Sequence, residues 1–146
     1  DTAQLDNNIF SATQSDQIRI AVCGAHLSGL PLNGELTARQ GKLLACTKTS
    51  PDYRLYALSE EASGRPGMVH VNDGEQGYAI DVEVWAMPAV ELGSFIAGIP
   101  KPLGIGTITL VDGEKVHGFL CEHYAVRNAI DISHLGGWRE YLAQSN

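Results

Sequence analysis

The sequence predicts a single α+β domain whose mixed β-sheet curls partly into a barrel and carries a few short helices. Short apolar runs rich in β-branched residues alternate with turns that contain glycine or proline, a pattern typical of strands. The 146 residues include 16 glycines, and a chain of this length buries roughly two-thirds of its unfolded surface around one core. We therefore expect one domain over residues 18–146, preceded by a polar linker or tail over residues 1–17.

The predicted tail is rich in Asn, Gln, Ser and Asp and offers only Leu5, Ile9 and Phe10 as apolar anchors. Such a composition buries too little apolar surface to order itself. The chain begins with Asp1 rather than Met. We therefore expect either a processed N-terminus or, as the preferred interpretation, a piece of a longer polypeptide.

Charge and cysteine content argue against several classes of function and indicate the redox state of the thiols. The net charge of −7 and the lack of a Lys/Arg cluster argue against binding to nucleic acid or to an anionic membrane surface. No apolar run approaches the ~20 residues that span a bilayer. Cys23, Cys46 and Cys121 lie in apolar runs without C-x-x-C spacing, which predicts buried free thiols in a cytoplasmic protein.

The first half of the chain predicts four strands. Residues 18–22 are rich in β-branched side chains, a pattern typical of a strand that is buried on both faces. After a glycine loop, Asn33-Gly34 predicts a turn, and residues 35–40 predict one helical turn. Ser50-Pro51-Asp52 predicts a turn between two later strands, because proline presets φ. The expected strands are residues 18–22, 42–49, 53–59 and 68–71.

A long strand is expected over residues 78–87, and Pro88 then stands at a favoured first helical position. Four apolar residues at the spacing i, i+3, i+4 and i+7 predict a short amphipathic helix. These residues are Leu92, Phe95, Ile96 and Ile99. Gly98 and Pro100 should end this helix.

Asp112-Gly113 is the strongest hairpin signal in the chain. It predicts two paired strands over residues 105–111 and 115–122. Ser133 could cap a last helix, although Gly136-Gly137 favours a later start, and Trp138, Tyr141 and Leu142 should pack this helix against the core.

The loop after the first strand holds Gly24 and Gly29, with His26 and Ser28 between them. Glycine permits positive φ and close approach of other groups, so the chain can turn sharply at this loop. Such a turn can aim consecutive N–H groups at one anion. We therefore expect the chemistry of the domain at this loop, with the imidazole of His26 at its rim.

The run Gly24-Ala25-His26-Leu27-Ser28-Gly29-Leu30-Pro31-Leu32-Asn33 resembles the C-terminal domain of allophanate hydrolase. The likeness continues in the same order through five further motifs, at residues 49–58, 82–88, 99–107, 118–122 and 131–138. The likeness as a whole extends over nearly everything from Ile18 to Leu142.

The resemblance implies a fold similar to that of gamma-glutamylcyclotransferases, whose signature glycine loop follows the first strand. It also implies a place in urea breakdown without urease. In that process an amidase domain of the same polypeptide removes ammonia from allophanate. The C-terminal domain then handles the product, N-carboxycarbamate, and promotes its decarboxylation.

Two departures from these families limit what the resemblance implies. No amidase domain is present in this chain, so the chain alone should not hydrolyse allophanate. Cyclotransferases use an acidic general base after the strand equivalent to residues 82–87. Here residues 88–103 offer only Glu91, which does not match that position, so cyclotransferase chemistry is disfavoured.

His26 is the candidate catalytic residue. Expelling CO2 from a carbamate nitrogen requires a proton at that nitrogen, and imidazole titrates near the working pH. On spacing alone, a structural histidine at the end of a strand is the commoner interpretation. The resemblance favours the catalytic one.

The candidate substrate-binding groups are the loop amides, a second backbone wall at Gly104 and Ile105, an arginine with a tyrosine, and one carboxylate. The loop amides could hold a small dicarboxylate without adding charge. Arg54, with Tyr56 on the same strand face, offers a planar fork for one carboxylate. Acidic side chains in apolar strands, Glu83 and Glu122, should be either paired or raised in pKa. The full set is Gly24, Ala25, Leu27, Ser28, Gly29, Leu30, Asn33, Arg54, Tyr56, Gly104, Ile105 and Glu122.

Two other arrangements are disfavoured, and we expect neither a metal nor a cofactor. Cys121-Glu122-His123 cannot converge on one ion, because adjacent strand residues point to opposite faces. Ser28 beside His26 lacks an evident orienting acid for a nucleophile pair.

Three functions are compatible with the sequence. The leading one is cofactor-free decarboxylation of N-carboxycarbamate, a small dicarboxylate. The alternatives are a non-catalytic assembly or dimerisation module of an amidase, and a cyclotransferase-like enzyme acting on acylated amines. The expected partner is an amidase domain of the same or of a second polypeptide, and a homodimer is left open.

Overall fold

The computed structural model describes residues 16–144, so most of the predicted tail lies outside the described residues. Its larger sheet has five strands in the order β2-β5-β1-β7-β6. Only β1 and β7 run parallel, and the other neighbours are antiparallel. The strands are β1 (Gln17–Val22), β2 (Lys42–Lys48), β5 (Asp81–Pro88), β6 (Leu103–Thr109) and β7 (Lys115–Cys121).

A smaller sheet of three strands, in the order β4-β3-β8, packs against the larger one. Its strands are β3 (Tyr53–Ala57), β4 (Pro66–His70) and β8 (Ile130–Asp131). An isolated bridge at Thr49–Leu110 joins the ends of β2 and β6, the two edge strands of the larger sheet, and a second at Tyr53–Tyr78 joins β3 to the segment before β5. The mixed α+β class is confirmed, and the two sheets pack around a shared inter-sheet core without closing into a barrel.

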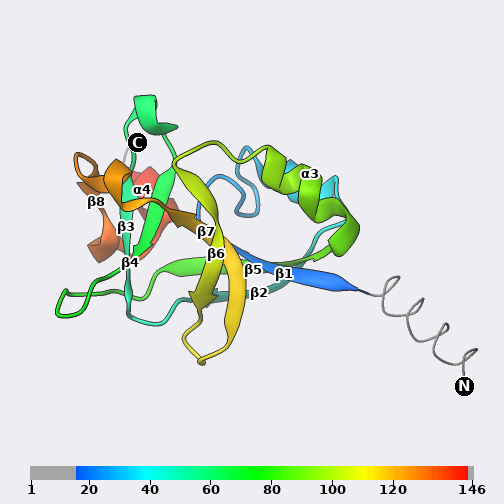
Figure 1. The fold of residues 1–146 in the computed structure, drawn as a ribbon, viewed down its shortest axis with the longest axis horizontal. Helices are drawn as coiled ribbons and strands as arrows, with labels where there is room; N and C mark the ends of the chain where they lie inside the picture. Colours follow the sequence, from blue (N-terminus) through cyan, green and yellow to red (C-terminus); the bar gives the residue numbers. More distant parts are fainter. Residues whose placement is uncertain (1–15, 145–146) are drawn as a thin grey trace, which may run out of the picture.

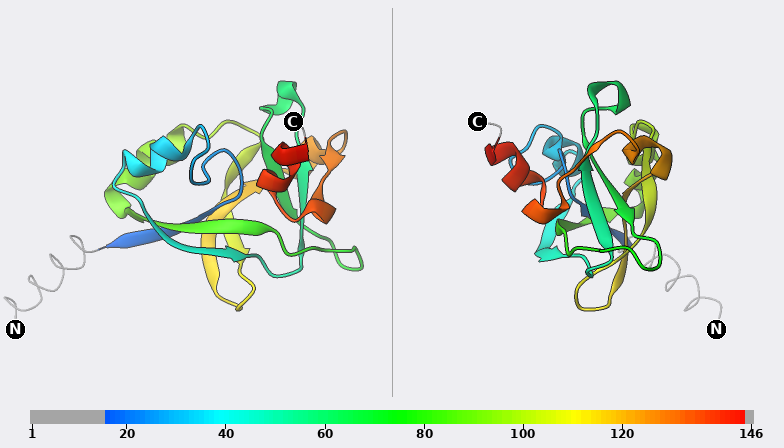
Figure 2. Two further views of the ribbon diagram at one scale, coloured as in Figure 1. Left: turned by 180° about the vertical axis from the view of Figure 1, so that it is seen from behind. Right: turned by 90° about the vertical axis from the view of Figure 1, so that its left-hand side faces the viewer.

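The helices are short and cover two separate regions. In Figures 1 and 2, α2 and α3 lie side by side over one face of the larger sheet, whereas α4 lies beside the smaller sheet. The α-helices are α2 (Asn33–Thr37), α3 (Leu92–Ala97) and α4 (Trp138–Gln144). Single 3₁₀ turns are η1 (Glu60–Ala62), η2 (Ala89–Glu91), η3 (His123–Val126) and η4 (Ser133–Leu135).

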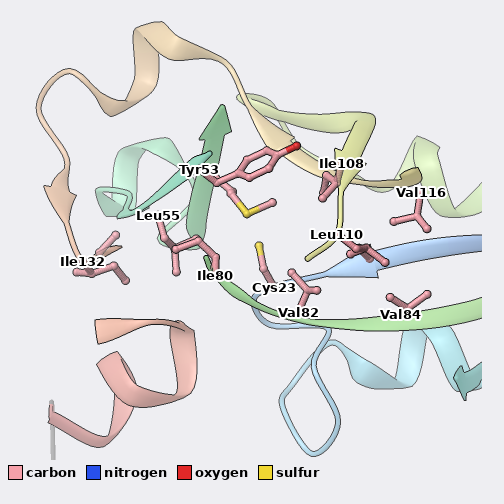
Figure 3. Packing of buried hydrophobic residues seen from close by; sticks show 13 residues of the cluster. Cys23, Tyr53, Leu55, Ile80, Val82, Val84, Ile108, Leu110, Val116 and Ile132 are labelled. Atoms are coloured by element: carbon pink, nitrogen blue, oxygen red, sulfur yellow. The ribbon is translucent and has the colours of Figure 1, made fainter. Parts of the chain in front are cut away.

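Strand β1 lies in the middle of the larger sheet and contributes side chains to two cores, because successive side chains of a strand point to opposite faces. Ile20 and Val22 enter the helix-side core under α2 and α3, whereas Ala21 and Cys23 enter the core between the sheets. The helix-side core consists of Ile20, Val22, Leu27, Leu36, Trp85, Met87, Phe95 and Phe119. Figure 3 shows the inter-sheet core, to which both sheets contribute.

Most predicted elements are confirmed, and the differences have local causes. The hairpin turns at Gly113, whose φ is 91°, and the last helix begins at Trp138 after the glycine pair. The helical turn after the loop begins at Asn33, two residues earlier than expected. Strand β5 begins at Asp81 rather than at residue 78, because Tyr78 pairs with Tyr53 instead.

The prediction of three buried thiols is wrong for Cys46. Cys23 and Cys121 are buried, but Cys46 is exposed because β2 is an edge strand of the larger sheet. Burial raises the pKa of Cys23 to about 12 and that of Cys121 to about 11. Both buried thiols therefore remain protonated at neutral pH. Within residues 16–144, no helix is long and apolar enough to cross a bilayer.

The parallel contact between β1 and β7 yields a stability prediction at Gly118. An added Cβ there would overlap Ile108 Cδ1 and lie 2.9 Å from the carbonyl oxygen of Ala21. Gly118→Ala should lower the free energy of unfolding by about 1–3 kcal/mol, the usual cost of overpacking a core. Urea unfolding followed by circular dichroism measures this. Gly104→Ala is the matched control, because its Cβ would meet nothing within 4 Å; equal losses in both variants would contradict the role assigned to close packing at Gly118.

Candidate active site

The loop that follows β1 is closed largely by its own backbone. The amide of Leu27 donates to Gly24 O at 3.0 Å, and that of Leu30 donates to Leu27 O at 3.0 Å. Gly29 takes a positive φ of 81°, which glycine adopts without strain. Several of the amides expected to bind an anion are therefore already used inside the protein. The amides of Ala25 and His26 have no acceptor in the part of the chain that the structure describes.

His26 is buried, with 4% of its surface exposed. Its Nε2 lies 2.7 Å from Glu35 Oε1 of α2. The ring stacks on Phe119 at 5.0 Å between centroids and meets the edge of Phe95 at 5.3 Å. Asn33 fixes the backbone by donating from Nδ2 to His26 O at 2.8 Å. The imidazole is thus held from three sides.

The contact with Glu35 determines which ring nitrogen is available for chemistry. An ionised carboxylate only accepts hydrogen bonds, so Nε2 of His26 carries the proton and donates. Nδ1 has no hydrogen-bond partner among residues 16–144. Burial lowers the pKa of His26 from its usual 6.5 and outweighs Glu35, while the charges of Arg65 and Arg39 lower it further. The resting ring is therefore neutral, with a lone pair on Nδ1.

A small cleft lies against His26, between the loop and the start of β4. Its lining residues are Cys23, Gly24, Ala25, His26, Arg65, Pro66, Leu103 and Phe119. Gly24 permits this close approach, because an added Cβ would lie 2.5 Å from Pro66 Cγ. Arg65, directly before β4, brings a cation to the cleft.

Glu83 fixes the loop from the side of the larger sheet. Its Oε1 accepts from the Ser28 amide at 2.8 Å, the Ser28 hydroxyl at 3.0 Å and Trp85 Nε1 at 3.1 Å. Its Oε2 lies 3.1 Å from Arg139 of α4, which also donates to Ser28 O at 2.6 Å. Burial by itself raises the pKa of Glu83, but the hydrogen bonds from Ser28, Trp85 and Arg139 more than offset it, and the pKa is lowered. Glu83 is therefore a paired, ionised carboxylate.

Several residues expected from the sequence are not brought to His26. Arg54 donates to Gln76 O at 2.8 Å and lies 3.8 Å from Glu75. Tyr56 packs against a separate cluster that contains Leu58 and Cys121. Gly104, Ile105 and Glu122 line a shallow groove along β6 and β7, which shares only Leu103 with the cleft. The expectation that Glu122 sits inside an apolar strand is wrong, because β7 ends at Cys121 and Glu122 is exposed.

Two residues at the cleft were not anticipated from the sequence. Glu35 follows His26 by nine positions, and the early start of α2 at Asn33 turns its carboxylate back onto the ring. A helix placed at Asn33 would have revealed this orienting acid. Arg65 carries no local signal, because only the packing of Pro66 on Gly24 brings it to the loop.

Comparisons with known proteins identify the family and the fold. The urea amidolyase of Saccharomyces cerevisiae is 41% identical over 131 residues, which are 88% of this chain and 7% of the relative. The solved allophanate hydrolase of Kluyveromyces lactis is 40% identical, with a TM-score of 0.84 over 90% of this chain and 22% of that one. The chain thus spans only a small part of these long relatives.

Other solved structures are closer in length. The E. coli protein c4763, described as specific to uropathogenic strains, is 32% identical, with a TM-score of 0.79 over 87% of this chain and 96% of that one. A mouse AIG2-like protein, at 13% identity and a TM-score of 0.56 over 75% of this chain and 78% of that one, shares the fold alone. The cyclotransferase-like fold expected from the resemblance is thereby confirmed. Residues 18–143 match the family described as allophanate hydrolase C-terminal domain, and the chain belongs to that family.

Proposed function

We propose that the cleft at His26 promotes decarboxylation of N-carboxycarbamate during urea degradation. The observation that carries this proposal is a buried, neutral imidazole, held by Glu35, whose Nδ1 has no partner within residues 16–144. Membership of the allophanate hydrolase C-terminal domain family supports the choice of substrate. The domain described here is not an amidase, so the substrate must come from an amidase domain outside it.

The reaction needs one proton and no cofactor. The C–N bond to one carboxylate breaks, CO2 leaves, and the electron pair stays on nitrogen. That nitrogen takes a proton and becomes the amine of carbamate. His26 Nδ1 is the proton donor, and a positioned general acid typically contributes 10²–10⁴-fold.

The neutral imidazole of His26 becomes a proton donor because the bound substrate brings negative charge close to the ring. Burial is the main reason that the pKa of His26 is lowered in the free protein, and the charges of Arg65 and Arg39 contribute less. A dianion in the cleft places negative charge beside the ring and offsets those two charges. Nearby negative charge favours the protonated imidazole. Nδ1 therefore takes up a proton from water when the substrate binds, and Glu35 stabilises the resulting imidazolium through Nε2.

The competing chemistries lack support at this site. The hydroxyl of Ser28 donates to Glu83 rather than to His26, so it is not an activated nucleophile. The acid bonded to His26 is Glu35, which approaches the ring from α2 and not from the segment after β5. A cyclotransferase-type general base is therefore not supplied where that reaction needs it.

A non-catalytic assembly role is the second candidate, and one observation favours it. Leu43 and Leu44 on the edge strand β2 are 44% and 55% exposed, and Val90 after β5 is 80% exposed. Exposed apolar side chains on an edge strand are a usual feature of contact surfaces. An amidase domain is the partner that this alternative implies.

His26→Gln separates the two candidates. When the chain is supplied with N-carboxycarbamate from a separate amidase, the variant should lose the acceleration of CO2 release, about 10²–10⁴-fold for a missing general acid. The measurement is the release rate above the spontaneous rate. His70→Gln is the matched control, because His70 is exposed, does not line the cleft, and contacts Val71 O and the edge of the Tyr53 ring. Unchanged release in His26→Gln, with amidase activity dependent on association, would favour the assembly role.

The lowered pKa of His26 also makes stability depend on pH. The unfolded chain binds a proton near pH 6.5, whereas folded His26 binds it only at lower pH, so the folded state loses stability as pH falls below about 6.5. Glu83 adds a similar loss only below about 4.5, where its unfolded pKa lies.

Thermal unfolding between about pH 5 and pH 8 isolates the contribution of His26. The melting temperature of the wild type should fall on the acid side of this range, and that of His26→Gln should fall less. His70→Gln should retain the full wild-type slope. A slope that is the same in all three proteins would show that His26 is not buried in its neutral form.

A further inference from the structure

Arg65 stands apart from the other arginines of the described chain. Four arginines have a hydrogen bond or an ion pair with a named acceptor, namely Arg19, Arg39, Arg54 and Arg139. Arg127 is exposed. Arg65 is half-buried, yet within residues 16–144 it has neither a hydrogen bond nor an ion pair. Its guanidinium nitrogens are not sealed from solvent, so its five donors are available to a carboxylate that enters the cleft.

The backbone holds Arg65 in place at the cleft. Its carbonyl oxygen accepts from the Leu58 amide at 3.1 Å. The next residue, Pro66, is buried against Gly24. Arg65 and His26 line the same cleft, and the charge of Arg65 acts on the imidazole. The backbone at Arg65 is therefore fixed beside the cleft, and its guanidinium lies among the cleft's lining groups.

The donors around the cleft suit a ligand with two negative ends. The amides of Ala25 and His26, which line the same cleft, also have no acceptor within residues 16–144. The domain carries a net charge of −7, so its overall field repels a dianion and attraction must be local. A guanidinium binds a carboxylate bidentately, which a lysine cannot do.

We propose that Arg65 is the specificity-determining residue of this cleft and binds one carboxylate of a dicarboxylate, while the other lies at His26 and the loop amides. The inference rests on the proposed function, because it names the group that selects the substrate of that site. It gives Arg65 the clamp role that the sequence pattern suggested for Arg54, whose guanidinium is bound to Gln76 and Glu75. A monocarboxylate gains little from Arg65 when its single charge lies at His26.

Calorimetric titration of the 146-residue chain with malonate and with acetate tests this directly. Arg65→Gln should weaken malonate binding roughly 10- to 100-fold, the range for a lost charge-assisted hydrogen bond. Acetate binding should change much less, so the preference for malonate should collapse. Arg65→Lys should fall between the two, because it keeps the charge but loses the planar fork.

Arg19→Gln is the matched control, since it removes the same charge from an exposed pair with Glu114. A loss of malonate affinity in Arg19→Gln equal to that in Arg65→Gln would overturn the proposal, as would wild-type affinity in Arg65→Gln. Absence of malonate binding to the wild type would overturn it too. Melting temperatures of all variants check that each one is folded.

The titration tests the role of Arg65, whereas the CO2 assay tests the decarboxylase, so each proposal can be rejected without the other. Loss of malonate affinity in Arg65→Gln, combined with no acceleration of CO2 release by the wild type, would keep the dicarboxylate site and reject the decarboxylase. Acceleration that survives in Arg65→Gln with an unchanged KM would keep the decarboxylase and reject Arg65 as its selector.

Discussion

The hydrogen bond between His26 and Glu35 is the interaction on which the site depends. It is 2.7 Å long, and it joins a loop residue with 4% exposure to a helix only five residues long. It fixes the ring between Phe119 and Phe95 and leaves Nδ1 as the reactive nitrogen. An unpaired histidine in the same apolar setting would have no reason to keep one orientation. The chemistry proposed for the domain therefore follows from where α2 begins.

A second carboxylate holds the same loop from the opposite side. Glu83 accepts hydrogen bonds from the amide and the hydroxyl of Ser28, and its other oxygen pairs with Arg139 of the last helix. Glu35 thus orients the imidazole, while Glu83 anchors the backbone that carries it. The carboxylate of Glu83 holds the loop in place. The donors available to a substrate anion are therefore Arg65 and the cleft amides that have no acceptor within residues 16–144.

Features encoded locally were predictable from the sequence. The hairpin at Asp112-Gly113 and the helix around Phe95 follow from turn chemistry and spacing that any short window of the sequence contains. The glycine loop after β1 likewise pointed to the place of the candidate site. The exposure of Cys46 was not predictable in this way, because it depends on β2 being an edge strand. Arg65 was missed for a similar reason, since its place depends on the packing of Pro66 against Gly24.

The protonation of the His26 ring tests the proposed chemistry most directly. Long-range ¹H–¹⁵N correlation spectra of the imidazole, recorded at neutral pH with and without malonate, distinguish its two nitrogens. We predict a neutral ring with the proton on Nε2 in the free protein, and a second proton on Nδ1 once malonate is bound. A free protein with the proton on Nδ1, or a ring whose protonation does not respond to malonate, would contradict the role assigned to His26.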